Sequence, residues 1–252
     1  NLKEIVEDLI DTFLNAGKIS LELREKDLTK KIKSDNTPVS NGDIEVNKLI
    51  TNKIKELTPS IPIVSEESSD NKSQDNLKDF WLIDPIDGTY DYINNLDEFT
   101  INAGLIINNQ PVAGLICAPA KKRMFYSYGK ELAFELINEE EVKLESNNFN
   151  KNEIEFVSSS NKIKPEIEKI HKKLKFKKYV RMKSSLKFCV IAAGEYHGYV
   201  AEPRACEWDI AAGHAILKHA GGNIKDFDGN ENLYGKKDFK NPSLILKSKS
   251  IL

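Results

Sequence analysis

Four apolar residues, 80–83, run directly into the acidic turn Asp84-Pro85-Ile86-Asp87-Gly88-Thr89, and this junction constrains the fold more than any other feature. The apolar run predicts a buried strand that ends at Asp84. Pro85 fixes the backbone between the two acids, and Gly88 permits a tight turn that brings backbone N–H groups and the Thr89 hydroxyl toward one point. The chain must therefore fold so that two carboxylates are held at one strand end.

Further acids stand at the ends of other predicted elements. Glu66 follows the short apolar run 63–64, and Asp43 opens a helical stretch. Asp209 comes directly after Trp208 at the predicted start of a helix, where it could cap the helix or point outward as a ligand. An isolated Asp-Pro-x-Asp-Gly is typical of a surface turn. Acids at several element ends together favour one shared cavity.

Such a cavity would need cations. Carboxylates about 4 Å apart repel by roughly 4 kcal/mol per pair at an effective dielectric near 20. An all-oxygen set without Cys or His favours Mg²⁺ or Mn²⁺ over zinc. Mg²⁺ commonly meets its substrate through phosphate oxygens, and a helix opened by the Gly88-Thr89 turn would present N–H donors to that phosphate. The acids therefore indicate phosphoryl chemistry.

The pattern of elements divides the chain in two. Apolar periodicity predicts a helix over residues 2–16 that Gly17 ends, a strand over 19–23 and a helix from Asp43 to residue 54. Strand-like runs over 99–107, 112–117 and 124–128 predict an antiparallel meander. Beyond a charged stretch at 139–152, strands at 154–158 and 199–201 alternate with helices at 165–174, 186–194 and 209–220, the last stopped by Gly221. The fold class is α/β, with an α+β metal-binding half, 1–150, and an α/β substrate-binding half, 151–252.

Composition narrows the function classes. The 252 residues include 37 Lys and Arg against 39 Asp and Glu, a net charge of −2 that indicates no nucleic-acid partner. Cys117, Cys189 and Cys206 lack a Cys-x-x-Cys spacing, an adjacent base and a Cys-x5-Arg phosphate loop, so buried free thiols are expected rather than a cysteine nucleophile. No apolar run approaches the roughly 20 residues that span a bilayer, and a cytoplasmic protein is expected. The four histidines stand apart from the acidic motifs and are expected to be surface or structural residues.

The acidic motifs resemble those of the inositol monophosphatase superfamily, whose members are Mg²⁺-dependent, lithium-sensitive phosphatases. The resemblance covers nearly the whole chain and rests on residues 66–68, 81–89, 208–213 and 220–222. It implies a sugar-phosphatase-like layered αβαβα sandwich. It also implies two to three metal ions, with Mn²⁺ as a substitute for Mg²⁺, and a homodimer as a further expectation.

The resemblance assigns roles residue by residue. Glu66, Asp84 and the carbonyl of Ile86 would bind the first metal, and Asp84, Asp87 and Asp209 the second. Glu66 and waters would complete a third, weaker site. Thr89 and Asp43 would orient and deprotonate a water that attacks phosphorus in line, without a covalent phospho-enzyme.

Several stretches resemble the branch of 3′(2′),5′-bisphosphate nucleotidases of the CysQ type. They are residues 33–40, 97–102, 207–214 and above all Ser184-Ser185-Leu186-Lys187-Phe188-Cys189. A nucleoside bisphosphate such as 3′-phosphoadenosine 5′-phosphate needs a cation away from the metals, and Lys187 with Ser184 is a candidate clamp for its second phosphate. On composition alone Lys187 would be a solvated residue.

Two departures leave alternatives open. The branch usually has Ser-Arg-Ser-His where residues 158–161 read Ser-Ser-Ser-Asn, and Arg204 is a candidate replacement for the missing guanidinium. Glu202 falls where inositol phosphatases hold a sugar hydroxyl. An inositol-1-monophosphatase or other sugar phosphatase therefore stays an alternative, and so does a catalytically silent metal or nucleotide sensor. Sequence also leaves open a peripheral contact with the inner membrane face.

Overall fold

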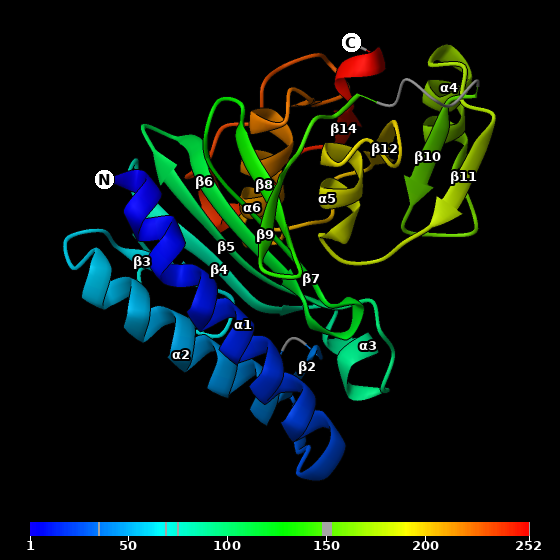
Figure 1. Ribbon diagram of the computed structural model, residues 1–252. Helices are drawn as coiled ribbons and strands as arrows, with labels where there is room; N and C mark the ends of the chain where they lie inside the picture. The colour runs from blue at the N-terminus through cyan, green and yellow to red at the C-terminus, as the bar shows by residue number, and fades with distance from the viewer. Residues whose placement is uncertain (35, 69, 75, 148–152, 252) are drawn as a thin grey trace.

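Two sheets and three helical layers alternate through the molecule (Figure 1). The computed structural model describes residues 1–34, 36–68, 70–74, 76–147 and 153–251. The helices are α1 (Leu2–Lys26), α2 (Asn41–Leu57), α3 (Thr89–Ile93), α4 (Pro165–Lys173), α5 (Leu186–Ala192) and α6 (Glu207–His219), with short 3-10 turns at Pro119–Lys121, Lys237–Phe239 and Lys249–Ile251. None of the helices among the described residues has the length and apolar character needed to cross a membrane.

The larger sheet has seven strands in chain order. Its strands are β3 (Ile63–Ser65), β4 (Phe80–Asp87), β5 (Thr100–Ile107), β6 (Gln110–Ala118), β7 (Arg123–Gly129), β8 (Leu132–Ile137) and β9 (Glu140–Lys143). β3 pairs with β4 in parallel, and every later pair is antiparallel, so the predicted meander is confirmed. A two-stranded ribbon, β1 (Lys30–Ile32) with β2 (Pro38–Ser40), lies between α1 and α2 in the chain.

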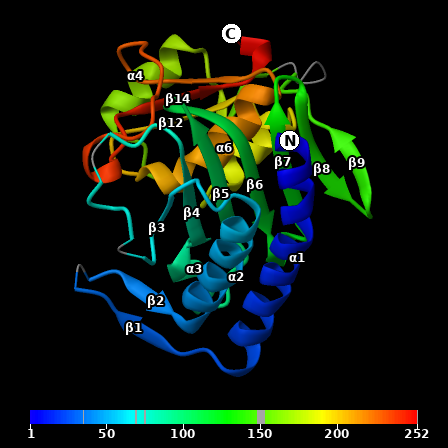
Figure 2. The same ribbon diagram turned by 90° about the vertical axis from the view of Figure 1, so that its left-hand side faces the viewer.

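The smaller sheet has five strands in the order β11-β10-β12-β14-β13. They are β10 (Glu155–Ser158), β11 (Lys178–Arg181), β12 (Gly198–Ala201), β13 (Asn223–Lys225) and β14 (Leu244–Lys247). β10 pairs in parallel with both β11 and β12, whereas β14 pairs antiparallel with β12 and β13. The predicted αβαβα sandwich is confirmed: α1 and α2, the large sheet, α5 and α6, the small sheet and α4 follow one another (Figures 1 and 2).

Strand β4 lies at the centre of this arrangement because both of its faces are apolar. Trp81 and Ile83 pack in the core beneath α1 and α2, while Phe80 and Leu82 pack in the core beneath α5 and α6. Such two-sided burial needs a helical layer on each face of the sheet. As a result, β4 carries its terminal acids into the interior.

Helix α6 is seated on the large sheet through two glycines. Gly104 and Gly114 are cross-strand partners on β5 and β6. A Cβ atom at Gly104 would lie 2.7 Å from the Ala211 Cβ, and one at Gly114 would lie 2.3 Å from the Ala212 carbonyl oxygen. The absence of side chains at these two positions lets α6 approach the sheet backbone, which fixes where its N-terminal acid lies.

Three expectations about the elements need correction. Helix α1 continues through Gly17 to Lys26, so the predicted helix end and the strand at 19–23 are wrong. Gly17 instead allows a close approach, since a Cβ there would lie 3.2 Å from the Cys117 sulfur. Strand β4 does not end at Asp84 but continues to Asp87 with an irregular register. The charged stretch contains β9, and the predicted boundary after residue 150 lies outside the described residues.

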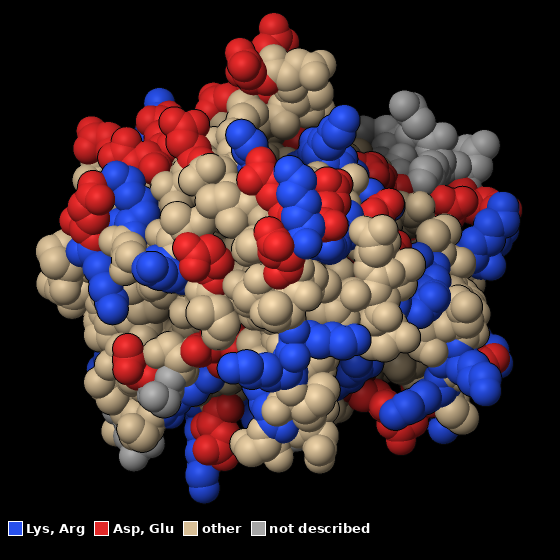
Figure 3. Space-filling model, turned by 90° about the horizontal axis from the view of Figure 1, so that it is seen from below, with Lys and Arg blue, Asp and Glu red and all other residues tan. Residues whose placement is uncertain are grey.

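Charge on the surface is mixed. Lys and Arg alternate with Asp and Glu over the face drawn in Figure 3, and neither sign covers it. This matches the near balance of 37 basic and 39 acidic residues in the chain.

Candidate active site

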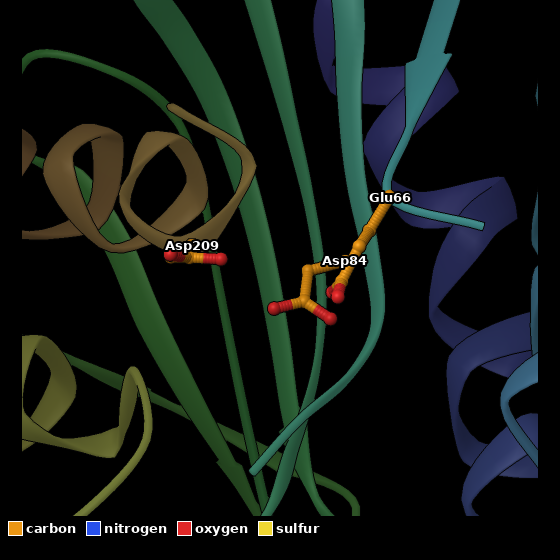
Figure 4. A group of neighbouring side chains, drawn as sticks. All are labelled: Glu66, Asp84 and Asp209. Carbon is orange, nitrogen blue, oxygen red and sulfur yellow. The ribbon is translucent and has the colours of Figure 1, made fainter. Parts of the chain in front are cut away.

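Three carboxylates from separate elements meet beside the large sheet. Glu66 follows β3, Asp84 lies on β4 and Asp209 lies on α6. One oxygen atom of each lies within 4.8 Å of the others. Figure 4 shows the three side chains pointing toward one another across the space between the strands and the helix. The structure thus brings together acids that are up to 143 positions apart in the chain.

Two of the acids are held by the same local device. Asp43 and Asp209 are each the third residue of a helix and belong to a capping box. The Asp43 Oδ2 atom accepts a hydrogen bond from the Ser40 backbone N–H at 2.8 Å, and the Asp209 Oδ2 atom accepts one from the Cys206 N–H at 2.7 Å. Asp209 is therefore not the cap residue itself. One oxygen of each acid is anchored, and the other is left for the site.

The pKa values of the acids reflect their burial and the repulsion between their negative charges. Burial and the charges of Glu66, Asp87 and Asp209 raise the pKa of Asp84 well above its ordinary value. Burial, Asp87 and Glu66 raise the pKa of Asp209 to about 8. Without added positive charge, the site cannot hold all of its carboxylates ionised at neutral pH.

The donor set fits a hard divalent cation. The Asp84 Oδ1 atom is buried and has no hydrogen-bond partner among the described residues. A buried anionic oxygen without a donor is costly unless a cation completes it. The group of carboxylates within 4.8 Å contains no His or Cys, and oxygen-only sets suit Mg²⁺ or Mn²⁺.

Asp87 borders the carboxylate group from the end of β4. Burial raises the pKa of Asp87 to about 6, although the charge of Lys187, a hydrogen bond from the Ser185 backbone N–H and the charge of Arg204 lower it. Asp87 is not part of the group of three, but its charge acts on both Asp84 and Asp209. Two cations and an N–H donor therefore partly offset the cost of burying the Asp87 charge.

Thr89 links the turn after β4 to α2. Its Oγ1 atom lies 3.1 Å from the Asp43 Oδ1 atom and 3.1 Å from the Ile86 carbonyl oxygen. A hydroxyl has one proton, so it donates to one of these acceptors at a time. Gly88 precedes it with a left-handed φ of 92°, and α3 starts at Thr89, as the turn predicts. Burial raises the pKa of Asp43, although bonds from Ser40 and Thr89 lower it.

Sequence reasoning missed two lysines beside Glu66. The Lys33 Nζ atom lies 2.5 Å from Glu67 Oε1 and 3.4 Å from Glu66 Oε1. The Lys72 Nζ atom donates to the Glu66 backbone carbonyl at 2.6 Å, and burial lowers the pKa of Lys72. Lys33 stands in a stretch that resembles the nucleotidases, so a signal existed for it. Lys72 lies in a polar loop that carries no such signal.

The predicted substrate residues lie in different surroundings. Lys187 is 7% exposed, its Nζ atom donates to the Ser184 carbonyl at 2.5 Å and it lies 5.2 Å from the centre of the Tyr199 ring, so it is not a solvated residue. Ser184 is buried with a left-handed φ of 54°. Glu202 forms an ion pair with Lys164. Arg204 is exposed, and its charge reaches Asp87.

Histidines and cysteines take no part in the carboxylate group. His214 and His219 are buried, and the His214 ring lies 2.9 Å from the Tyr234 hydroxyl. All three cysteines are free, as predicted, but Cys206 is only partly buried because it caps α6 at the edge of the site.

Comparison with known proteins agrees with this geometry. The model of the inositol monophosphatase family matches residues 1–251. The 3′(2′),5′-bisphosphate nucleotidase CysQ of Aggregatibacter actinomycetemcomitans is 30% identical over 250 residues, which cover 96% of this chain and 92% of the relative. CysQ of Escherichia coli K12 is 31% identical over 233 residues, covering 90% and 93%. The crystal structure of CysQ from Bacteroides thetaiotaomicron superposes with a TM-score of 0.80 at 28% identity, covering 97% of each chain. The chain belongs to the inositol monophosphatase family and is a phosphatase.

Proposed function

We propose that this phosphatase is a Mg²⁺-dependent 3′(2′),5′-bisphosphate nucleotidase that converts 3′-phosphoadenosine 5′-phosphate and water to AMP and phosphate. The observation that carries the proposal is the carboxylate group of Glu66, Asp84 and Asp209, whose ligand atoms lie within 4.8 Å of one another and include a buried residue with an unpaired oxygen. This arrangement is unfavourable without a cation and suited to one that carries a phosphate ester.

The chain supplies ligands for more than one ion. Glu66, Asp84 and the Ile86 carbonyl would hold one Mg²⁺, and Asp84, Asp87 and Asp209 a second. Bound Mg²⁺ supplies positive charge that polarises the phosphate, acidifies the attacking water and stabilises the leaving oxygen. The same charge would allow Asp84, Asp87 and Asp209 to be ionised together at neutral pH.

Thr89 and Asp43 would handle the proton of the attacking water. The Thr89 hydroxyl donates toward Asp43 Oδ1 at 3.1 Å, which leaves its lone pairs able to accept a hydrogen bond from water. Burial raises the pKa of Asp43 and so makes it a better proton acceptor than an exposed carboxylate. The hydroxyl would orient the water and pass its proton toward Asp43 as the bond to phosphorus forms.

The nucleoside bisphosphate is favoured as substrate by the cations near Asp87. Lys187 and Arg204 both lower the pKa of this carboxylate, so positive charge lies near Asp87, and the exposed Arg204 would meet a second phosphate there. Support also comes from the curated relatives named CysQ, which are 30–31% identical to this chain. Glu202, the residue that would hold a sugar hydroxyl, forms an ion pair with the exposed Lys164, so an inositol hydroxyl would have to compete with that lysine.

The test is a side-by-side assay of phosphate release. 3′-Phosphoadenosine 5′-phosphate and inositol 1-phosphate would each be incubated with the protein in Mg²⁺ and in EDTA. We expect Mg²⁺-dependent release with a higher kcat/KM for the nucleotide. Preference for the inositol ester would reject the nucleotidase assignment and leave a sugar phosphatase.

Two variants separate an enzyme from a silent sensor. Asp87→Asn is expected to abolish phosphate release because it removes a ligand and a charge. Asp11→Asn changes an exposed acid on α1 and is expected to retain full activity. A chain that binds Mg²⁺ and nucleotide but releases no phosphate would be a sensor rather than an enzyme.

A further inference from the structure

Lys72 contacts the two chain segments that bring Glu66 and Asp209 to the site. Its Nζ atom donates to the Glu66 backbone carbonyl at 2.6 Å. The same atom lies 4.9 Å from the centre of the Trp208 ring, and Trp208 is the residue directly before Asp209. A single ammonium group thus joins the loop after β3 to the start of α6.

The Glu66 backbone is held from its other side as well. Its N–H donates to the Ile83 carbonyl at 3.0 Å, and Ile83 directly precedes Asp84. Pairing of β3 with β4 therefore sets Glu66 relative to Asp84. No strand pairing joins Glu66 to α6, and it is the Lys72 ammonium that spans this gap among the described residues.

The Trp208 ring that Lys72 contacts is itself held by packing. Its indole ring packs on the core between the two sheets and lies 6.0 Å from the Phe239 ring, measured between centres. A cation above an indole face is attracted by the ring quadrupole, so the lysine is held in one place rather than free in solvent.

We infer that Lys72 is a positioning residue for the metal centre: its ammonium group sets the separation between Glu66 and Asp209 and so raises the affinity for a divalent cation. The inference rests on the proposed function only in taking these carboxylates as metal ligands. Groups that orient metal ligands without touching the metal commonly change affinity by 10- to 100-fold when they are removed.

If Lys72 acted only through its charge, its removal would change the metal affinity in the opposite direction. A lysine charge close to a bound cation repels it, so removal of the charge alone would tighten metal binding. Removal of a positioning contact would weaken it. The direction of the change therefore decides between the two roles.

The experiment measures Mn²⁺ binding to the purified full chain through the EPR signal of the free ion, at fixed pH and ionic strength. Lys72→Met is expected to raise the Kd about tenfold. Lys72→Arg is expected to stay within about twofold of the unaltered chain, because a guanidinium both donates hydrogen bonds and stacks on aromatic rings. Lys78→Met, an exposed lysine of the same loop, is the matched control and should leave the Kd unchanged.

A double-mutant cycle guards against a general loss of structure. If Lys72 acts through the indole ring, Lys72→Met combined with Trp208→Leu should weaken Mn²⁺ binding no more than the stronger single change. Additive effects would overturn the inference, and so would a Lys72→Met variant that binds Mn²⁺ as tightly as the unaltered chain or more tightly. Melting of the metal-free variants shows whether each is folded; a Kd that rises only in step with unfolding would also overturn it.

Failure of the inference and failure of the proposed function give different results. If Lys72→Met weakens Mn²⁺ binding in a chain that releases no phosphate, the positioning role stands and the proposed function falls. If phosphate is released and Lys72→Met leaves the Kd unchanged, the proposed function stands and the positioning role falls. An unaltered chain without Mn²⁺ binding would overturn both.

Discussion

At the scale of single residues, the site uses two acids, Asp43 and Asp209, in which one carboxylate oxygen is already hydrogen-bonded to the backbone and only the other can bind a ligand. In Asp43 and Asp209 the Oδ2 atom accepts a hydrogen bond from the backbone N–H of a helix cap, at 2.8 and 2.7 Å. This bond fixes the rotation of each carboxylate, so the remaining oxygen has a defined direction. For Asp43 that oxygen accepts from Thr89 at 3.1 Å.

The hydroxyl of Thr89 is therefore a direct test of the proton pathway. Thr89→Val keeps the shape of the side chain and removes the group that would orient water. We expect kcat to fall by about 10² to 10⁴, the range typical of general acid–base groups, with little change in KM. Thr89→Ser keeps the hydroxyl and should retain most of the activity; steady-state kinetics in saturating Mg²⁺ measure both. Equal rates for Thr89→Val and the unaltered chain would remove Thr89 from the mechanism.

The acids could be proposed from sequence because each stands at the end of an apolar element, a local pattern that can be read without coordinates. Glu66 follows β3, and Asp84 and Asp87 lie in the last four residues of strand β4. Lys72 could not be predicted, because its role comes from Trp208, which lies 136 positions further along the chain. Burial of Lys187 also depends on packing against Tyr199 and was invisible to composition.

At the scale of elements, α6 carries Asp209 to the site, and the two glycines beneath it set its height above the sheet. Gly114→Ala would place a Cβ atom 2.3 Å from the Ala212 carbonyl oxygen, which belongs to the helix backbone and cannot rotate away. We expect the helix to shift, with a loss of about 1–3 kcal/mol in unfolding free energy, the usual cost of overpacking. Mn²⁺ affinity should fall as well, since Asp209 moves with α6.

Gly17→Ala is the matched control on the opposite face of the sheet. Its Cβ atom would lie 3.2 Å from the Cys117 sulfur and 3.2–3.3 Å from ring atoms of Pro119, contacts much looser than the 2.3 Å at Gly114. A small shift relieves them, and the preference of alanine for the helical conformation offsets the remaining strain. Chemical denaturation and Mn²⁺ titration should show little change for this variant. Unaltered metal affinity in a folded Gly114→Ala variant would show that the seating of α6 does not govern the site.

Helices and strands could be predicted where one hydrophobic period runs through the whole element. The predictions were wrong where a residue is explained by a tertiary contact rather than by its neighbours in the sequence. The antiparallel meander and the helices α4 and α6 follow from the local sequence pattern alone. A glycine after an apolar stripe predicts a helix end at Gly17, yet Gly17 lies inside α1, where Cys117 and Pro119 approach the helix closely. The edge strands β9 and β11 are exposed along their length and carry no apolar alternation to reveal them.

At the scale of the whole molecule, the layered fold buries a set of like charges that only a cation can balance. The pKa of Asp209 rises to about 8 and that of Asp87 to about 6, both above the ordinary value of 3.8. In EDTA the folded chain then binds more protons than the unfolded chain over this range, so these groups stabilise it at low pH and the benefit is lost as pH rises through 6 and 8.

A pH series of melting temperatures tests this balance. His214 and His219, whose pKa values burial lowers to about 3 and 4, destabilise the fold only as pH falls below their ordinary 6.5. From about pH 6.5 to 8.5 the decline in EDTA should therefore come mainly from Asp84 and Asp209, whose pKa values both lie well above the ordinary value of 3.8. Saturating Mg²⁺ should raise the melting temperature most at the alkaline end, and Asp209→Asn should flatten the EDTA profile. Parallel profiles with and without Mg²⁺ would contradict the account.

The most direct measurement of the central claim is the anomalous scattering of Mn²⁺ in crystals of the protein. The account predicts anomalous peaks among Glu66, Asp84 and Asp209: one lies about 2–2.5 Å from carboxylate oxygens of Glu66 and Asp84, and a second lies at the same distance from carboxylate oxygens of Asp84 and Asp209, the range of hard-cation bonds to oxygen. A Mn²⁺-saturated crystal with no peak among these three carboxylates, or with its peak at another site, would contradict it.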